Sequence, residues 1–291
     1  MTAAARRAVV AHVPETGEAA GAPISERRAC RWLGMHRTPI RYVSRRAPDT
    51  DTELRTRPRA LAAEHPRWGV PRLAWRLRRE GRPDNDKRIE RIYREDALAV
   101  RRRGQKRVAR ARVPRPAPAG PNERWSMDFG RDTPAGGLVF RALTVVDEFT
   151  REALVIEVDT SLPELRVAQV LERLAATRGR PATIGVDNGP EFAGRALDAW
   201  AHRHGVTLQC IRPGKPVENA YIESLNGRLR DECLNVHWFL SVADARRQIE
   251  AWRVGYNVAR PHRGLAGRTP EEYAREHERL QLVPDPTRLS A

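Results

Sequence analysis

Three acidic residues, Asp128, Asp187 and Glu223, are of the type and at the spacing that could hold metal ions for catalysis. Asp128 lies inside an apolar segment, between Trp125 and Phe129, where a charged group without a partner is costly to bury. Asp187 ends an apolar strand segment 59 residues later, and Glu223 follows after a gap of 35 residues. Acids held close together repel one another unless a cation neutralises them. Hard oxygen ligands that leave room for water and phosphate suit Mg²⁺, so this set of acids indicates a magnesium site.

Each of these acids also has an ordinary structural interpretation. Asp128 could be a surface acid on an edge strand, and Asp187 could form a turn, because Asp-Asn-Gly is common in turns. Glu223 could be an exposed helix residue. The choice between the two interpretations depends on whether the surrounding elements bring the three acids together.

The segment from Asn122 onward has an alternating pattern of strands and helices that would bring the three acids together. Three strand segments joined by tight turns come first, followed by helix, strand, helix, strand and two further helices. This order is typical of an RNase H-like α/β domain, a mixed five-stranded sheet with flanking helices. We assign this catalytic domain to residues 122–275 and a C-terminal tail to residues 276–291. The expected strands lie within residues 124–130, 138–150, 151–159, 182–189 and 206–213, and the expected helices within residues 163–179, 191–205, 217–234 and 243–257.

Positive charge is concentrated in the first part of the chain. Residues 1–120 hold 30 of the 53 Arg and Lys residues but only 13 of the 37 acidic residues. We expect a flexible leader over residues 1–24, followed by an all-α DNA-binding region over residues 25–100 with two units of the helix-turn-helix type. The second unit places a candidate recognition helix at residues 85–97. Its candidate DNA contacts, whose ordinary interpretation is a solvated helix face, are Lys87, Arg88, Arg91 and Arg94.

Local signals mark the first helical unit and the segment that precedes the catalytic domain. Ser25 is expected to cap the first helix of that unit, and Gly34 to form its turn. Residues 101–121 are basic and then Pro-rich, with too few apolar residues for a core, so we expect an extended linker. The basic residues at its start that could contact the phosphate backbone are Arg101, Arg102 and Arg103.

The composition argues against several other classes of protein. No apolar run approaches the roughly 18 residues that a membrane span needs. Cys30, Cys210 and Cys233 lie far apart, so neither a disulfide framework nor a zinc site of cysteines is expected. We therefore expect no membrane association and a reducing, cytoplasmic setting.

Five sequence blocks stand in a regular order from residue 125 onward: WSMDF, LTVVDEFTRE, VDNGPEF, IRPGKPVENAYIESLNGRLRDECL and YNVARPH. In order and spacing they resemble bacterial insertion-sequence transposases of the "IS three" (OrfB) type. This family belongs to the Asp-Asp-Glu superfamily, which includes retroviral integrases. The resemblance is strongest over residues 122–275 and weaker over residues 25–105.

The resemblance implies a role for each acid. Asp128, Asp187 and Glu223 match the family's metal-binding catalytic acids, where two Mg²⁺ ions, or Mn²⁺ in their place, would bind. Arg230 matches a basic position associated with the DNA substrate. Asn219, Glu223 and Arg230 would share one face of a helix. Asn219 and Lys215 are further candidate DNA contacts.

Together these observations predict a DNA transposase. It would nick the 3′ ends of an insertion sequence and transfer the strands, in DNA integration and recombination, by two-metal phosphoryl transfer. The alternatives are an RNase H-like nuclease without strand transfer and a non-catalytic DNA-binding regulator. The expected partners are the terminal inverted repeats of the element, target DNA, further copies of the chain on DNA, and an upstream-frame protein or a fusion with it. DNA binding would place the protein at the bacterial nucleoid.

Overall fold

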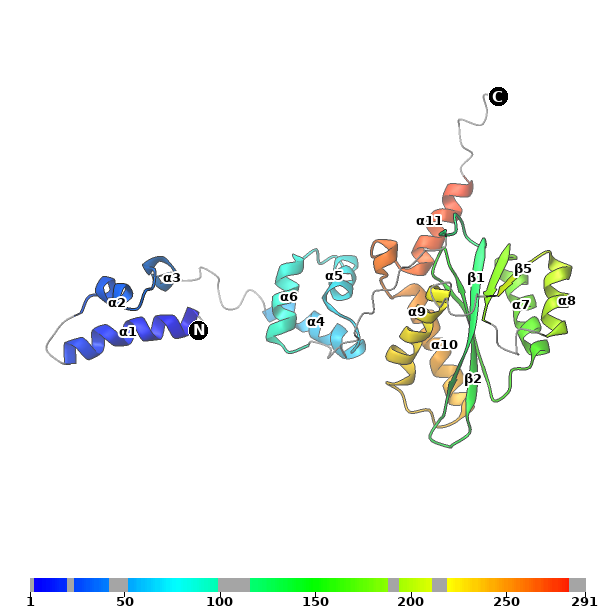
Figure 1. Ribbon diagram of the computed structural model, residues 1–291, viewed down its shortest axis with the longest axis horizontal. Helices are drawn as coiled ribbons and strands as arrows, with labels where there is room; N and C mark the ends of the chain where they lie inside the picture. Colours follow the sequence, from blue (N-terminus) through cyan, green and yellow to red (C-terminus); the bar gives the residue numbers. More distant parts are fainter. Residues whose placement is uncertain are drawn as a thin grey trace, which may run out of the picture. The chain divides into compact units, whose positions relative to one another are not determined.

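The structure is a computed structural model of the chain, and it describes residues 3–19, 24–41, 52–98, 116–187, 194–210 and 219–282 (Figure 1). The chain falls into two compact units, Met1–Leu54 and Arg55–Ala291. The boundary between them lies inside residues 25–100, the range expected to form one helical DNA-binding region. Among the described residues, no helix has both the length and the apolar character that a membrane crossing would require.

The described residues of the first unit include three helices, α1 (Ala3–Ala19), α2 (Glu26–Trp32) and α3 (Arg37–Arg41). The expectation of a flexible leader over residues 1–24 is wrong for residues 3–19, because these form α1. Val10 of α1 is buried together with Ala29 and Cys30 of α2. The Ala-rich start of α1 favours a helix, and this tertiary contact supplies apolar burial that a short helix needs.

Helix α2 and the turn that follows it agree with the expected helix-turn-helix order. The hydroxyl of Ser25 accepts a hydrogen bond from the backbone N–H of Arg28 at 3.3 Å and so caps α2. Gly34 has a φ of +62° in the turn before α3, a conformation that glycine adopts without strain.

The second unit begins with a small helical bundle of three helices, α4 (Thr52–Glu64, within this unit from Arg55), α5 (Val70–Arg79) and α6 (Asp86–Glu95). Leu61, Leu73 and Ile89 bring the three helices into one apolar cluster. The side chain of Asn85 accepts a hydrogen bond from the N–H of Lys87 at 2.9 Å and caps α6. A helix is thus confirmed at the position of the candidate recognition helix.

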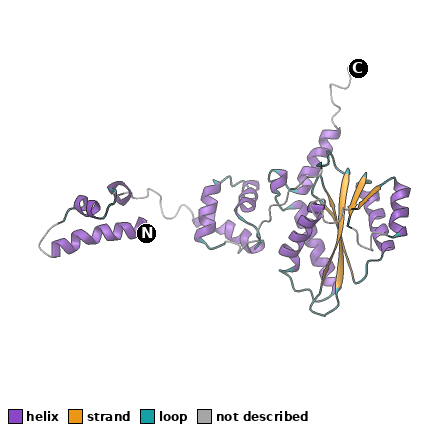
Figure 2. Cartoon of the chain, viewed as in Figure 1, coloured by secondary structure: helices purple, strands orange, loops and turns teal. Residues whose placement is uncertain are grey.

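The remainder of the second unit is built on a five-stranded sheet in the order β3-β2-β1-β4-β5. The strands β1, β2 and β3 form an antiparallel meander, whereas β4 runs parallel to β1 and β5 runs parallel to β4. This mixed sheet with helices on both faces is the RNase H-like fold that the sequence predicted (Figure 2). The strands are β1 (Arg124–Asp132), β2 (Phe140–Asp147), β3 (Ala153–Asp159), β4 (Thr183–Val186) and β5 (Thr207–Cys210).

Alternate residues of the strands face two separate cores. Trp125 and Met127 of β1 pack with α7 and α8 on one face. Phe140 and Ala142 of β2 pack with α10 and the residues after α9 on the other face. Even-numbered residues of β1 therefore face α9. The helices are α7 (Glu164–Arg178), α8 (Arg195–His204), α9 (Ala220–Leu229) and α10 (Val242–Val258).

Helix α11 (Pro270–Leu282) crosses the expected boundary between the catalytic domain and the tail. Thr269 and Glu272 form a capping box at its start, each side chain accepting the backbone N–H of the other at 3.3 and 2.9 Å. The rings of Tyr273 and His277 lie against Phe149, at centroid distances of 5.4 and 4.7 Å. The assignment of a tail from residue 276 is therefore wrong for residues 276–282, because this cap and these contacts make the segment part of the folded unit.

Candidate active site

Asp128 and Asp187 occupy equivalent positions on two neighbouring parallel strands. The register of β1 and β4 places Ser126 opposite Gly185. Continued by two residues, it places Asp128 opposite Asp187, which directly follows β4. Neighbouring strands lie about 4.8 Å apart, and residues in register point to the same face of the sheet. Two carboxylates from separate strands therefore meet at the carboxyl end of β4.

Helix α9 is joined to this strand pair by Asn226. The amide Nδ2 of Asn226 donates a hydrogen bond to Oδ2 of Asp128 at 2.8 Å. Its Oδ1 accepts a hydrogen bond from Oγ1 of Thr144 on β2, also at 2.8 Å. Glu223 lies one turn before Asn226 on α9, and its side chain is exposed. The contact of Asn226 therefore positions the helix that carries the third acid.

The electrostatic environment of Asp128 links all three acids. Burial of its carboxyl group raises its pKa, and the negative charges of Asp187 and Glu223 raise it further. Hydrogen bonds from the backbone N–H of Phe129 and from Asn226 act in the opposite direction. Charge effects weaken with distance, so these two contributions indicate that both acids lie near Asp128.

The donors gathered here fit a hard divalent cation. All three are carboxylates, and a cation among them would relieve the charge repulsion that raises the pKa of Asp128. Within the part of the chain that the structure describes, no group of three His, Cys, Asp or Glu side chains is placed to hold one ion.

The other residues predicted from this helix have different environments. Arg230 is exposed directly after α9, where a π-helical turn begins. Asn219 precedes α9 and is only 6% exposed, and its Oδ1 has no hydrogen-bond partner among the described residues. Asn219 is the N-cap residue of α9, so its place on a common face with Glu223 and Arg230 stays a prediction. Lys215 lies outside the described residues.

The candidate DNA contacts of α6 are mostly paired with acids. Lys87 is exposed near the start of the helix. The three arginines form ion pairs with acids four residues away, so a phosphate would have to replace or share these partners. These pairs are Arg88 with Asp84 at 3.1 Å, Arg91 with Glu95 at 3.5 Å and Arg94 with Glu90 at 2.5 Å. Arg101, Arg102 and Arg103 lie outside the described residues.

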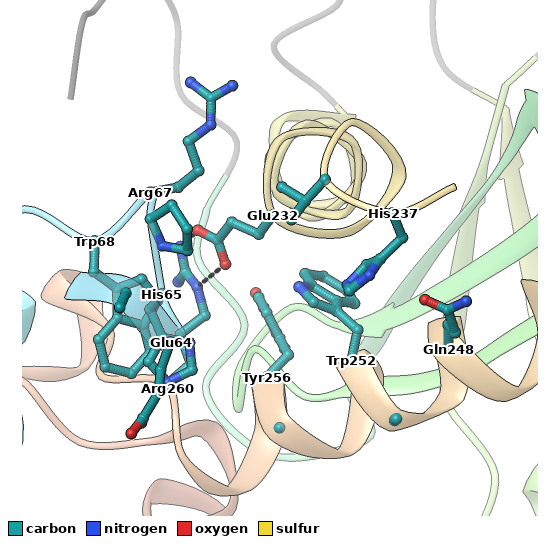
Figure 3. A pocket seen from close by; sticks show the side chains of 15 residues that line it. Glu64, His65, Arg67, Trp68, Glu232, His237, Gln248, Trp252, Tyr256 and Arg260 are labelled. Atoms are coloured by element: carbon teal, nitrogen blue, oxygen red, sulfur yellow. Dashed lines mark hydrogen bonds and ion pairs between the residues drawn. The ribbon is translucent and has the colours of Figure 1, made fainter. Parts of the chain in front are cut away.

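A cavity of about 510 Å³ lies between the α4–α5 corner and α10, and none of the three acids lines it (Figure 3). Aromatic rings line two of its sides. On one side the rings of His65 and Trp68 are stacked, with centroids 3.8 Å apart, and on the other the ring centroids of Trp252 and Tyr256 are 5.1 Å apart. At its side, Arg260 donates two hydrogen bonds, at 2.7 and 2.8 Å, to the carboxylate of Glu232 (dashed line in Figure 3). No pattern in the sequence predicts this cavity, although Tyr256 and Arg260 belong to the YNVARPH block.

Comparison with known proteins gives matches over most of the chain. Residues 118–216 and residues 204–270 match two families that are both described as integrase core domains. A 31.7 kDa protein of insertion element IS407 from Burkholderia multivorans is 49% identical over 263 residues, which cover 90% of this chain and 94% of that protein. A 39.2 kDa protein of insertion element IS476 from Xanthomonas euvesicatoria is 44% identical over 260 residues, covering 89% and 75%.

More distant similarity connects the chain to a named transposase. InsF, the transposase of insertion sequence IS3A from Escherichia coli, is 23% identical over 235 residues, covering 74% of this chain and 79% of that protein. The chain belongs to the IS3 family of insertion-sequence transposases. In the present chain, the integrase-core match over residues 118–216 contains Asp128 and Asp187, and the match over residues 204–270 contains Glu223. Both matches fall on the part of the second unit that is built on the five-stranded sheet.

Proposed function

We propose that this transposase cuts and joins DNA by metal-dependent phosphoryl transfer, with Asp128, Asp187 and Glu223 as its catalytic acids. The observation that supports this most strongly is the parallel register of β1 and β4, which brings two of the acids to one end of the sheet. The hydrogen bond from Asn226 to Asp128 adds the helix that carries the third. Acids whose pKa is raised by burial and by like charges are typical of functional sites.

Each acid has a separate role in this proposal. Asp128 would bind both Mg²⁺ ions, with Asp187 as a second ligand at one and Glu223 as a second ligand at the other. Two bound ions of this kind activate a nucleophile and stabilise a leaving oxygen. Asn226 donates to one oxygen of the Asp128 carboxylate and thereby fixes its orientation toward the metal side.

The chemistry consists of two phosphoryl transfers. In the first, a water oxygen bonds to phosphorus at the end of the element and the bond to the 3′ oxygen breaks, which leaves a 3′-hydroxyl. In the second, that hydroxyl oxygen bonds to a phosphorus of another strand, whose own 3′ oxygen leaves. Each nucleophile loses its proton to solvent, and no serine or tyrosine of the protein forms a bond to DNA. By analogy with the family, the second strand is the other end of the same element, and the product is circular.

The helical regions would hold the DNA during these steps. The candidate contacts on α6 and in the linker lie in the strongly basic part of the chain, and phosphate contacts of this kind position DNA without reading its sequence. Arg230, Asn219 and Lys215 would contact DNA near the acids. The two ends of an element would require more than one copy of the chain, together with an upstream-frame protein or a fusion with it.

The proposal is tested with Asp187→Asn on a duplex that contains a labelled end of the element, in Mg²⁺, with nicking and joining scored separately. Both reactions should fall on the order of 100-fold or more, because one metal ligand is lost, while DNA binding persists. Asp198→Asn changes an exposed acid on α8 in the same way and should leave both reactions intact. Wild-type nicking by Asp187→Asn would contradict the assignment, and nicking without joining by the wild-type protein would favour a nuclease.

A structure with Mg²⁺ and DNA bound provides an independent check. The carboxylates of the three acids should then lie within roughly 4–7 Å of one another, as ligands of a shared pair of ions. A structure that leaves one of them far from the other two would rule out the catalytic assignment of that acid.

A further inference from the structure

Helix α5 contacts the catalytic part of the chain through one face. The indole of Trp75 lies so close to Gly267 that a Cβ on this glycine would stand 2.8 Å from the ring. Arg79, one turn later, donates a hydrogen bond to the carbonyl O of Gly267 at 3.0 Å and pairs with Glu272. Arg72 lies one turn before Trp75 on the same face of α5. Arg72 is therefore directed toward the region that follows α10.

That region connects the α5 contact to Arg260. The N–H of Gly267 donates a hydrogen bond to the carbonyl O of His262 at 2.8 Å. The ring of His262 lies edge-on to Tyr256 at a centroid distance of 4.8 Å, and its Nε2 is 3.3 Å from Nη1 of Arg260. Arg260 itself is only 4% exposed. A continuous set of contacts thus runs from α5 to this buried arginine.

A third arginine approaches the same place from α9. Glu232, in the π-helical turn, forms the bidentate ion pair with Arg260, and Arg228 lies about one turn before Glu232. At 100° per residue, Arg228 is turned roughly 140° away from Glu223 around the helix axis. The positive charges of Arg260 and Arg228 both act on Arg72, so the three arginines lie near one another, with Arg228 turned away from Glu223 around α9.

The charges at this junction are unbalanced. Among the described residues, Arg72 and Arg228 form no ion pair or hydrogen bond with an acid, and Glu232 is already paired with Arg260. The pKa of Arg72 is lowered to about 10, mainly by burial and then by the positive charge of Arg260. The pKa of His262 is lowered to about 2 by burial and by the charges of Arg260 and Arg72. In the free protein the junction is therefore a partly desolvated site with excess positive charge.

We propose that this junction binds a backbone phosphate of the DNA substrate through Arg72 and Arg228, at a site distinct from the three acids. The proposal rests on the proposed function, which makes DNA the substrate. A desolvated cation among like charges is unfavourable, and a phosphate removes that cost while accepting bidentate hydrogen bonds from guanidinium groups. Such a contact would position DNA between α5 and the catalytic part without reading its sequence.

The test measures binding of the full chain to a random-sequence duplex by fluorescence anisotropy, in the absence of Mg²⁺ and over a range of salt concentrations. Arg72→Gln should reduce the slope of log K against log salt by about 0.9, and Arg72→Gln with Arg228→Gln by about 1.8. Affinity at low salt should fall several-fold. Arg275→Gln removes an exposed arginine of α11 that pairs with Glu271, and it should leave the slope unchanged. Unchanged slopes in both junction variants would overturn the proposal.

Thermal unfolding of the free protein separates this role from a structural one. Arg72→Gln should melt at the same temperature as the wild type or higher, because it removes a desolvated charge that has no acidic partner. A melting temperature several degrees lower, with an unchanged salt slope, would make Arg72 a structural residue and overturn the proposal.

Free phosphate is the other source of the same ligand chemistry. Melting in inorganic phosphate is compared with melting in chloride at equal ionic strength. One outcome is that phosphate stabilises the wild type but not Arg72→Gln, while the salt slope of duplex binding is the same for both. That result would assign the site to a small anion and overturn the DNA assignment. Because binding is measured without metal, the result is independent of the acids. If only the junction variants fail, by keeping the wild-type salt slope, this site is refuted. If only Asp187→Asn fails, by nicking DNA like the wild type, the proposed function is refuted.

Discussion

Asp128 receives a hydrogen bond on each of its carboxylate oxygens, from the backbone N–H of Phe129 and from Asn226, both at 2.8 Å. The first bond depends only on the local backbone, whereas the second depends on the packing of α9 against β1. Asn226 also accepts the hydroxyl of Thr144, so its amide is fixed in orientation by a partner on each side. At the scale of single residues, the candidate site therefore depends on an amide that has no charge of its own.

Asn226→Ala should reduce nicking and joining by about 10- to 100-fold while DNA binding is retained. The variant removes the donor that orients Asp128 and leaves the Thr144 hydroxyl without its amide partner. The rates are measured on a labelled duplex over a titration of Mg²⁺, and the concentration for half-maximal rate should rise. Asn235→Ala, at an exposed asparagine, is the matched control. Equal Mg²⁺ dependence in Asn226→Ala and the wild type would argue against a positioning role.

Arg230→Ala should weaken joining by roughly 10-fold or more and leave metal binding by the acids intact. Arg230 follows Glu223 by seven residues, about 10 Å along the helix axis, which suits DNA beside the scissile phosphate better than a metal ligand. Alignment of nucleophile and leaving group supplies much of the rate of such reactions. Nicking and joining are scored separately, with Arg275→Ala as control. Wild-type rates for both reactions would indicate that Arg230 is simply solvated.

At the scale of elements, the ends of the helices decide how the strands are placed. Helix α8 ends at Gly205, which has a φ of +65° and a ψ of +28° and leads directly into β5. Space is open around the position of a Cβ there, so only the backbone conformation requires glycine. Gly255, inside α10, also has open space but lacks a positive φ.

The two glycines should therefore respond in opposite directions to the same substitution. Gly205→Ala should lower the free energy of unfolding by about 1 kcal/mol, because alanine is strained in the left-handed conformation. Gly255→Ala should raise it by roughly 0.5–1 kcal/mol, because alanine favours the helix interior. Urea unfolding followed by circular dichroism measures both values. A shift of the same sign for the two variants would contradict this account.

At the scale of the whole molecule, charge and catalysis are assigned to different parts of the chain. The basic excess lies in residues 1–120, whereas the three acids lie in the part that matches the integrase core. In the proposed function, long-range attraction to DNA and the chemistry on DNA would therefore depend on different residues. The junction of Arg72 and Arg228 is where the helical bundle of the second unit would contribute directly to the placement of DNA.

Removal of metal should separate these two properties. Chelation by EDTA should abolish nicking and joining, because the proposed mechanism needs ions bound by the acids, while duplex binding should keep a strong dependence on salt. Activity assays and anisotropy titrations of the same preparation measure the two properties side by side, and added Mg²⁺ should restore the reactions. Cutting that survives chelation would refute a metal-dependent mechanism.

Much of the second unit could be predicted from the sequence because the relevant signals are local. Alternating apolar residues and the lengths of apolar runs predicted the strands, and the helix patterns between them gave the right order. The spacing of 59 residues between Asp128 and Asp187 equals the register offset between β1 and β4. This spacing can be read from the sequence, but only the pairing of β1 with β4 shows that it places the two acids opposite each other.

Other features depended on contacts between residues far apart in the sequence. In the sequence Asn226 is an ordinary helix residue. Its contact with Asp128, 98 residues earlier in the chain, forms only when α9 packs against β1. Helix α1 required burial of Val10 against α2, and the cluster of Arg72, Arg228 and Arg260 required three separate elements to meet. Patterns along the sequence report which face of an element is apolar, but they do not report which faces meet. The order of the elements therefore followed from the sequence alone, and the sequence also proposed the three acids, whereas the groups that orient and surround these acids were decided by tertiary packing.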